Sequence, residues 1–363
     1  MNVINSSFPK VSIMIPTYNR AHYLVDAIES SLAQDYPNFE VIVSDNHSTD
    51  GTEECVRKYL SDARFRYYRN ASNLGSGPNY EKLLYEYAKG EYGHYLTDDD
   101  YFIDKNHLRT AIEIIKKYNV KVVFSAGVSR YEEYGREDEI LSLGLDEVIP
   151  RQWWLGNFCK TKYGLTYFPP CGSGTVFEIK KAKELNAFGR QSYYGDYEFA
   201  VKCILSDLNT GYIKEPSFAA RRHEGQDGRT SYNNAFQGTL IFNNIYDFGC
   251  ELNLDRKTLE KIRFRGFKYF TMGFLMPNWV NENGNSLSSL IAFLRELKKF
   301  DKRLPLATIF NINTMTQFIF YNTPIYHKLE KIYLSYRNCR LSNYLRDKKL
   351  KMKTLGKFLT KNI

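Results

Sequence analysis

The chain has 363 residues, 43% of them hydrophobic and 25% charged, which is the composition of a globular protein with a substantial core. Its net charge of +9 would suit nucleic acid, an anionic membrane surface or phosphate-bearing substrates, and charge alone does not choose among these. The six cysteines form no CxxC pair, and no apolar run approaches the ~20 residues that span a bilayer. These features exclude a zinc finger. With a polar N-terminus unlike a signal peptide, they predict a cytoplasmic protein, soluble or peripheral.

Short apolar runs alternate with helical patterns over roughly the first 125 residues. The apolar runs predict buried strands at residues 11–15, 39–43, 65–69, 92–96 and 121–125. Helical spacing predicts helices at residues 24–32, 55–60 and 78–88, the first capped by Asn19 and the second by Asp50. Strands that alternate with helices predict a doubly wound, mostly parallel sheet.

The second part of the chain follows a different pattern. Residues 126–235 are more irregular and include a small-residue segment at 168–174 and helical spacing at 196–205. After about residue 236 the chain reads as mostly helical, and residues 328–363 are strongly basic with apolar residues on one helical face. A basic amphipathic helix is typical of a membrane-surface element, and equally of a solvated helix that packs on its domain.

Three polar clusters stand where predicted strands end, at residues 17–20, 45–50 and 98–100. Ligands of doubly wound sheets bind beyond the carboxyl ends of the strands, so these clusters are expected to meet at one edge. The last cluster is three adjacent aspartates, which repel one another unless something neutralises them. A hard divalent cation would do so, and a solvated turn or helix cap is the alternative.

Four segments share an order and spacing that is far more specific than any one of them alone: residues 15–20, 41–50, 73–79 and 90–100. Together they resemble the family 2 glycosyltransferases of the GT-A fold, strongly over residues 10–125 and more weakly to about 230. The resemblance implies a GT-A catalytic domain at residues 1–235, with a nucleotide-sugar half at about 10–125 and an acceptor half at about 126–235. A mostly helical C-terminal region would follow at 236–363.

The first strand and the second strand end are implied to hold the nucleotide. Pro16, Thr17 and Tyr18 match the motif that lines the nucleoside pocket. Asp45 matches the acid that contacts the base, whereas Ser44 replaces the acid before it. The residues assigned to the nucleotide sugar by resemblance are Pro16, Thr17, Tyr18, Arg20, Asp45, Asn73, Asn79, Asp98, Gly172, Ser173 and Arg222.

The acidic run is similar to the family's Asp-x-Asp motif, with Thr97 in place of the first acid. The resemblance implies that Asp99 is the main metal ligand, that Asp98 serves the ribose, the sugar or indirectly the metal, and that Asp100 is the third choice. His223, in a late segment that closes on the diphosphate, is a metal ligand, a phosphate contact or a structural histidine. The implied cofactor is Mn²⁺ or Mg²⁺, which stabilises the leaving diphosphate as a Lewis acid.

The expected general base lies at the start of the helix predicted at 196–205. Asp196 falls where the family's catalytic base lies, with Gly195 in place of the preceding acid and Glu198 as the fallback. As an alternative, Asp196 is a helix N-cap. The segment at 168–174 resembles the loop that approaches donor sugar and acceptor, and a plain turn is its alternative. One base and direct displacement predict inversion at the anomeric carbon.

The expected activity is that of an inverting glycosyltransferase (EC 2.4) that moves a sugar from a nucleotide sugar to a hydroxyl of a glycan or lipid-linked acceptor. UDP-sugars are the expected donors. Cell-surface polysaccharide synthesis, at the inner face of the membrane if the basic tail binds there, is the expected setting. A catalytically inactive sugar-nucleotide-binding relative is one rival, which the loss of an acid at Thr97 would suit. A nucleotidyltransferase is another, although it would carry a basic, Gly-rich loop after the first strand. Nucleic acid is not an expected partner, because no recognisable binding module is present.

Overall fold

The computed structural model describes residues 8–131, 138–162, 165–166, 172–186, 195–223, 236, 238–271, 275–284 and 286–305. The chain forms two compact units, one of residues 1–157 with 169–263 and the other of residues 158–168 with 264–363. The basic tail at 328–363 and the first part of the segment at 168–174 lie outside the described residues. The catalytic-domain end near residue 235 stays a prediction. No helix in the described ranges is long and apolar enough to cross a membrane.

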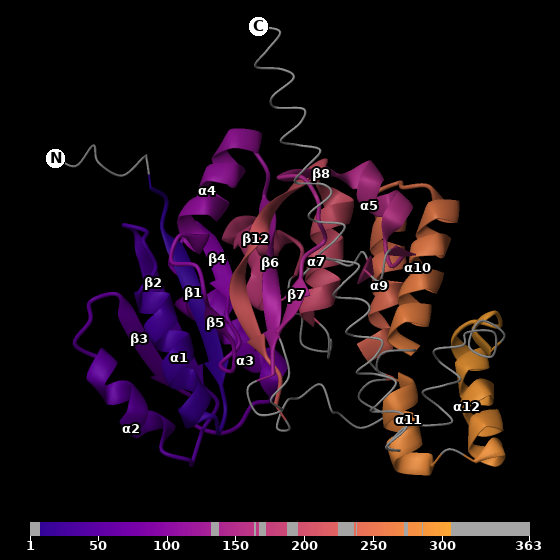
Figure 1. The fold of residues 1–363 in the computed structure, drawn as a ribbon, viewed down its shortest axis with the longest axis horizontal. Coiled ribbons are helices and arrows are strands. Elements are labelled where there is room, and N and C mark those ends of the chain that lie inside the picture. Colours follow the sequence, from indigo (N-terminus) through magenta and orange to yellow (C-terminus); the bar gives the residue numbers. More distant parts are fainter. Residues whose placement is uncertain are drawn as a thin grey trace, which may run out of the picture. The chain divides into compact units, whose positions relative to one another are not determined.

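The first unit is built on one large sheet with the strand order β3-β2-β1-β4-β11-β6-β12-β5, where β7 adds beside β6 and β8 beside β12 (Figure 1). A separate hairpin of β9 and β10 belongs to the second unit. The strands are β1 (Val11–Thr17), β2 (Phe39–Asp45), β3 (Phe65–Arg69), β4 (Tyr92–Tyr95), β5 (Tyr101–Phe102), β6 (Val122–Arg130), β7 (Glu139–Leu141), β8 (Val148–Pro150), β9 (Thr161–Lys162), β10 (Leu165–Thr166), β11 (Thr175–Glu178) and β12 (Asn209–Arg221).

All five strands predicted from the apolar runs are present, as β1, β2, β3, β4 and β6. β1 pairs in parallel with β2 and with β4, so that Val11 lies opposite both Phe39 and Tyr92. The expected parallel, doubly wound arrangement is therefore confirmed over the first four strands. Beyond β4 the sheet becomes mixed, because β11 inserts antiparallel between β4 and β6 while β6 and β12 run parallel.

Helices of the first unit lie where the sequence predicts them, at residues 24–32, 55–60, 78–88 and 196–205, whereas those at residues 107–118, 151–157 and 179–184 were not predicted. The helices of this unit are α1 (Ala21–Leu32), α2 (Thr52–Val56), α3 (Ser76–Lys82), α4 (His107–Tyr118), α5 (Arg151–Asn157), α6 (Ile179–Glu184), α7 (Gly195–Ser206), α9 (Ile241–Glu251) and α10 (Arg256–Phe270), the last of which continues into the second unit. Short helical turns lie at Arg57–Tyr59, Leu83–Tyr87 and Gly172–Gly174.

The prediction that Asn19 caps α1 is wrong. Asn19 has a left-handed backbone (φ 53°), and its side-chain oxygen accepts the Thr49 backbone N–H at 2.8 Å. The first N–H of α1, that of Ala21, is donated instead to Asp50 Oδ2 at 2.9 Å. Asp50 also accepts from the side chain and backbone of Thr52, the first residue of α2, at 2.6 and 3.3 Å, although the N-cap of α2 is Gly51 and not Asp50 as predicted. One carboxylate therefore begins two helices and fixes the β1–α1 loop.

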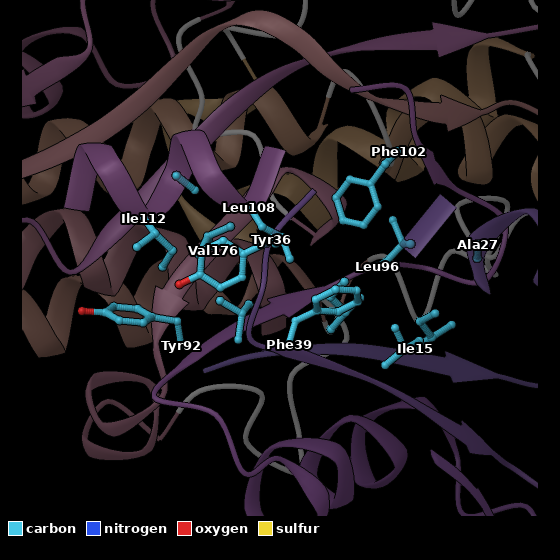
Figure 2. Close-up of a cluster of buried hydrophobic side chains, with 14 of the residues drawn as sticks. Ile15, Ala27, Tyr36, Phe39, Tyr92, Leu96, Phe102, Leu108, Ile112 and Val176 are labelled. Carbon is cyan, nitrogen blue, oxygen red and sulfur yellow. The ribbon is translucent and has the colours of Figure 1, made fainter. Parts of the chain in front are cut away.

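Strand alternation places opposite faces of β1 against different helices. Val11, Ile13 and Ile15 are fully buried and join one apolar cluster with residues of α1, α2 and α4. Figure 2 shows side chains of this cluster, among them Ile15, Leu96 and Phe102, which come from separate parts of the sheet. The burial of this cluster is the main stabilising term of the sheet.

The opposite face of the sheet carries a line of aromatic contacts. Tyr80 of α3 packs on Tyr95 of β4 with ring centroids 5.0 Å apart, and Tyr95 stacks on Phe177 of β11 at 5.7 Å. Phe177 in turn meets Phe199 of α7 edge to face at 5.0 Å. These rings connect α3 to α7 across two strands, and both helices carry residues of the predicted site.

The second unit contains α11 (Met276–Asn283) and α12 (Leu287–Phe300). Ser286 caps α12 by accepting the Ser289 N–H at 3.2 Å. Trp279 of α11 donates to Ser289 Oγ at 2.9 Å and packs on Phe293, with ring centroids 5.5 Å apart. The expected helical character after residue 236 is confirmed for the described residues.

Candidate active site

The three predicted polar clusters meet at the carboxyl ends of β1, β2 and β4. Thr17 is the last residue of β1, and its hydroxyl donates to Asp98 Oδ2, just after β4, at 2.8 Å. The backbone carbonyl of Thr17 accepts the Asn46 N–H, just after β2, at 2.9 Å. Pro16 pairs with Ser44 in the sheet register, and Tyr18 beyond the strand end is 45% exposed. The geometric expectation of one shared edge is therefore met.

Asp45 is fully buried at the end of β2, with both carboxylate oxygens engaged. Its Oδ1 accepts the Ser48 N–H at 2.8 Å, and its Oδ2 accepts the Tyr67 hydroxyl at 2.6 Å. Arg69 lies 3.4 Å from the same Oδ2. In this arrangement Asp45 fixes the loop after β2 and orients two side chains of β3.

A network of side-chain amides lies next to Asp45. Asn79 is buried and accepts from Ser44 Oγ at 2.7 Å and from Asn70 Nδ2 at 2.9 Å. Asn46 donates to Asn73 Oδ1 at 2.8 Å. The role of Asn79 in this network is to hold α3 against β2, while Asn73 is exposed at the loop. The sequence pattern singled out neither Asn46 nor Asn70, although both side chains extend this network.

Arg20 joins two of the three acids in the run. Its Nη1 lies 3.0 Å from Asp98 Oδ1 and 3.2 Å from Asp99 Oδ2. Both carboxylates are buried. Burial and the neighbouring charge of Asp99 raise the pKa of Asp98, and the guanidinium of Arg20 and the Thr17 hydroxyl only partly offset this.

Asp99 also meets His223, which follows β12. His223 Nε2 lies 3.1 Å from Asp99 Oδ2, and its ring packs on Tyr23 of α1 with centroids 4.4 Å apart. Burial alone would raise the pKa of Asp99. The hydrogen bond from His223 and the charge of Arg20 outweigh burial and lower that pKa. The structure thus brings together the two residues that were predicted first as metal ligands.

Asp100 takes part in different contacts. Its Oδ2 accepts the Ser173 hydroxyl at 2.6 Å, and its Oδ1 accepts the Arg221 backbone N–H at 3.1 Å. Ser173 also accepts the Thr97 backbone N–H at 3.1 Å. Burial and the charge of Asp99 raise the pKa of Asp100. Asp100 therefore ties the acidic run to the 172–174 turn and to the end of β12.

Arg221, the last residue of β12, and Arg222, just after it, have different partners. Arg221 is buried and bonds the backbone oxygen of Asp99 at 3.3 Å and Asp26 Oδ2 at 2.7 Å. Arg222 instead donates from Nε to Ser129 Oγ at 3.2 Å. The structure therefore gives Arg221 a bracing role behind the acids, and it does not bring Arg222 to their side chains in any contact among the described residues.

Asp196 lies in the first turn of α7, beside the turn that carries Ser173. Gly172 has a left-handed backbone (φ +66°), and a Cβ built on it would lie 3.7 Å from Asp196 Oδ2. Burial raises the pKa of Asp196 to about 6. Burial and the charges of Asp196 and of the acidic run raise the pKa of Tyr80 well above its usual range. Glu198, the fallback base, is paired with Lys202 at 2.7 Å.

The donor set near Asp99 fits a divalent cation only in part. Among the described residues no three His, Cys, Asp or Glu side chains converge on one point. Asp99 and His223 supply one carboxylate oxygen and one imidazole nitrogen, which are ordinary ligands of divalent metals. A metal held there would take its remaining ligands from water and from donor phosphates.

Comparison with known proteins identifies the family. The family model described as glycosyl transferase family 2 matches residues 12–180. An uncharacterized glycosyltransferase of Rickettsia typhi is 39% identical over 236 residues, which are 63% of this chain and 69% of that protein. The chain belongs to glycosyltransferase family 2.

Two further proteins show what relatives of this glycosyltransferase do. The GalNAc(5)-diNAcBac-PP-undecaprenol beta-1,3-glucosyltransferase of Campylobacter jejuni is 40% identical over 94 residues, 25% of this chain and 30% of that protein. The crystal structure of Staphylococcus aureus TarS 1–349 in complex with UDP-GlcNAc aligns with a TM-score of 0.64 and 18% identity over 93% of this chain and 92% of that one. The second likeness confirms the GT-A fold, and the first covers less than a third of its relative.

Proposed function

We propose that this glycosyltransferase is metal-dependent and inverting, and that it transfers a sugar from a UDP-sugar to a hydroxyl of a glycan or lipid-linked acceptor of the cell surface. The observation that carries the proposal is the hydrogen bond between Asp99 and His223, together with the 172–174 turn, in which Ser173 bonds the Thr97 N–H and Gly172 lies beside Asp196. The TarS complex with UDP-GlcNAc supports a UDP-sugar, and the undecaprenol-linked acceptor named for the Campylobacter enzyme supports a lipid-linked one.

On the donor side, the protein would orient the diphosphate at the carboxyl ends of β1 and β4. Asp99 and His223 would hold a Mn²⁺ or Mg²⁺ ion, which as a Lewis acid supplies stabilisation of the charge on the departing diphosphate. The hydroxyl of Thr17 fixes Asp98 beside this pair. Exposed Tyr18 and Asn73 stand at the same edge to meet the nucleoside.

On the acceptor side, Asp196 would remove the proton from the attacking hydroxyl. A carboxyl with a pKa of about 6 is still mainly ionised at neutral pH, and it is a stronger base than an exposed aspartate. The left-handed turn at Gly172 leaves space next to Oδ2 that a side chain would fill. One base with direct displacement at the anomeric carbon gives inversion.

The test is a thermal-shift screen of UDP, GDP, CDP and ADP with and without Mn²⁺, followed by measurement of nucleoside diphosphate release from the matching nucleotide sugars. We expect UDP with Mn²⁺ to raise the melting temperature most, because a ligand of the native state stabilises it in proportion to its affinity. Asp99→Asn should remove the part of the increase in melting temperature that depends on Mn²⁺. Asp146→Asn, which changes a side chain that is 76% exposed, should keep that part.

Three outcomes of the screen would each reject part of the proposal. A larger shift with another nucleotide would reject UDP, and an equal shift without Mn²⁺ would reject metal dependence. Binding of UDP without any turnover of UDP-sugars would favour the catalytically inactive relative.

A further inference from the structure

We propose that Arg20 is a counter-ion built into the acidic run, which a divalent cation displaces from Asp99 and which then binds the donor diphosphate. This inference rests on the proposed metal dependence. Arg20 Nη1 alone bridges the two carboxylates, at 3.0 Å from Asp98 Oδ1 and 3.2 Å from Asp99 Oδ2. The guanidinium therefore occupies the position between the acids that a cation would be expected to fill.

The oxygen that Arg20 contacts is also the one that faces His223. Asp99 Oδ2 lies 3.2 Å from Arg20 Nη1 and 3.1 Å from His223 Nε2. This oxygen is also the one that Asp99 would offer, beside the His223 imidazole, to a metal held there. The acids are buried, so repulsion between the metal and the guanidinium would be weakly screened. Arg20 and the metal cannot both stay on Asp99 Oδ2.

The surroundings allow the Arg20 side chain to move while the acids stay. The loop before it is fixed by Asn19, whose N–H donates to Ser48 Oγ at 2.8 Å and whose side chain accepts from Thr49 at 2.8 Å. The side chain of Arg20 is 18% exposed, against 8% or less for those of Asp98 and Asp99. Arg20 is therefore more exposed than the two acids that it bridges.

The diphosphate is the natural second partner for the displaced guanidinium. Arginine binds phosphate oxygens through paired N–H groups, and such charge-assisted hydrogen bonds are strong. The exchange also keeps charges matched, because the metal replaces the guanidinium on the acids while the guanidinium gains an anionic partner. Arg20 would thereby couple metal entry to donor binding, each favouring the other.

The test compares Arg20→Gln with wild type in Mn²⁺ binding without nucleotide, measured by electron paramagnetic resonance of free Mn²⁺. Loss of the competing charge should tighten Mn²⁺ binding about tenfold, within the usual range of coupling between two ligands. With saturating Mn²⁺, the same variant should bind UDP about tenfold more weakly, because the diphosphate loses a partner. Arg66→Gln is the matched control, since Arg66 is exposed and bonds only the backbone oxygens of Ala63 and Phe65 in the described contacts.

The outcomes separate the exchange from the metal site itself. Unchanged or weaker Mn²⁺ binding by Arg20→Gln overturns the exchange, and the metal site stands if Asp99→Asn abolishes binding in the same assay. If neither wild type nor Arg20→Gln binds Mn²⁺, metal dependence and the exchange fail together. Arg20→Lys keeps the charge and should return Mn²⁺ affinity toward wild type, and Arg20→Met, which also removes the charge, replaces the Gln variant if that protein does not fold.

Discussion

The parallel part of the sheet, β3-β2-β1-β4, and the mixed part, β11-β6-β12-β5, contribute to the site by different routes. In the parallel part β1 and β2 end on site residues, Thr17 and Asp45, and β4 is followed by Asp98–Asp100. In the mixed part the contributions come from the turn before β11, from α7 and from the end of β12. The first part gathers a ligand site by local βα repetition, and the second adds reactive groups by long-range pairing.

This difference separates two tasks. The parallel part holds groups suited to a nucleotide diphosphate, whereas the mixed part carries Asp196, the proposed base for the acceptor. Asp100 and Ser173 join the two parts through a 2.6 Å hydrogen bond. The predictions below test whether the two parts can be disabled separately and how strongly they are joined.

The largest expected effect is that of Asp196→Asn, which should disable only the mixed part. Transfer should fall by about 10³-fold because the acceptor loses its general base, while UDP affinity with Mn²⁺ should stay close to wild type. In wild type the rate should rise with pH through about 6, as Asp196 ionises. Initial rates of nucleoside diphosphate release from pH 5 to 8, together with calorimetric UDP titration, measure both quantities.

Glu198→Gln is the comparison variant, since it removes an acid two residues along the same helix. Glu198 binds Lys202 at 2.7 Å and accepts from Asn244 at 3.3 Å, so we expect a change in stability with most of the activity kept. A loss in this variant equal to that of Asp196→Asn would transfer the base assignment to Glu198.

The order of elements and the gathering of Thr17, Asp45 and Asp98 at one edge could be predicted from the sequence, because strand period and the parallel-sheet rule are local. The insertion of β11 beside β4 could not, since Val176 and His94 pair across a long separation that no local pattern encodes.

The sequence also did not predict that the adjacent side chains of Asp99 and Asp100 point to different partners. Asp99 meets His223 and Asp100 meets Ser173 because the run lies in a turn, where Asp100 N–H donates to the Thr97 carbonyl at 3.1 Å. Strand or helix periodicity therefore does not assign their directions.

The next largest expected effect is on the pH dependence of stability. It comes from two buried histidines at the boundary between the two parts of the sheet. His94 of β4 and His107 of α4 have ring centroids 4.9 Å apart, and His107 Nδ1 lies 2.8 Å from Ser217 Oγ of β12. Burial holds the pKa of His94 well below its usual range and lowers that of His107 to about 4. Both are therefore neutral in the folded chain, while the unfolded chain takes up protons below about pH 6.5.

The sign follows from linkage, since a lowered pKa in the folded state removes stability as the pH falls below the unfolded value. For His107 the loss runs from about pH 6.5 to 4, and a difference of 2.5 units is about 3 kcal/mol at the lower end. Carboxyls with raised pKa act in the opposite direction, so the quantity to compare is wild type against His107→Gln. Urea unfolding followed by fluorescence of buried Trp154 measures it.

His107→Gln should lose less stability than wild type between pH 6.5 and 4. The slope of its free energy of unfolding against pH should be smaller by the uptake of about one proton. The matched control is His22→Gln, which removes an exposed histidine and should keep the wild-type slope. Equal slopes in wild type and His107→Gln would mean that His107 is protonated in the folded state at these pH values.

The smallest expected effect is on the link between the two parts, through Ser173→Ala. Ser173 donates to Asp100 and accepts from the Thr97 N–H, so the change leaves buried polar groups short of a partner, at about 1–3 kcal/mol of stability. Ser173 is a positioning residue, because the preceding residue, Gly172, lies beside Asp196, at 3.7 Å from Oδ2 to a Cβ built on the glycine. We therefore expect kcat to fall about tenfold, the loss that 1.4 kcal/mol would give, with little change in UDP affinity.

Ser206→Ala is the control, since Ser206 donates to the Cys203 carbonyl within α7 and lies away from the acids in the described contacts. A purely structural role for Ser173 would lower the melting temperature and leave kcat at the Ser206→Ala value. A fall in UDP affinity instead of kcat would mean that the 172–174 turn serves the nucleotide, and that the link transmits strain into the parallel part. Only a loss confined to kcat fits a turn that positions Asp196 from the acidic run.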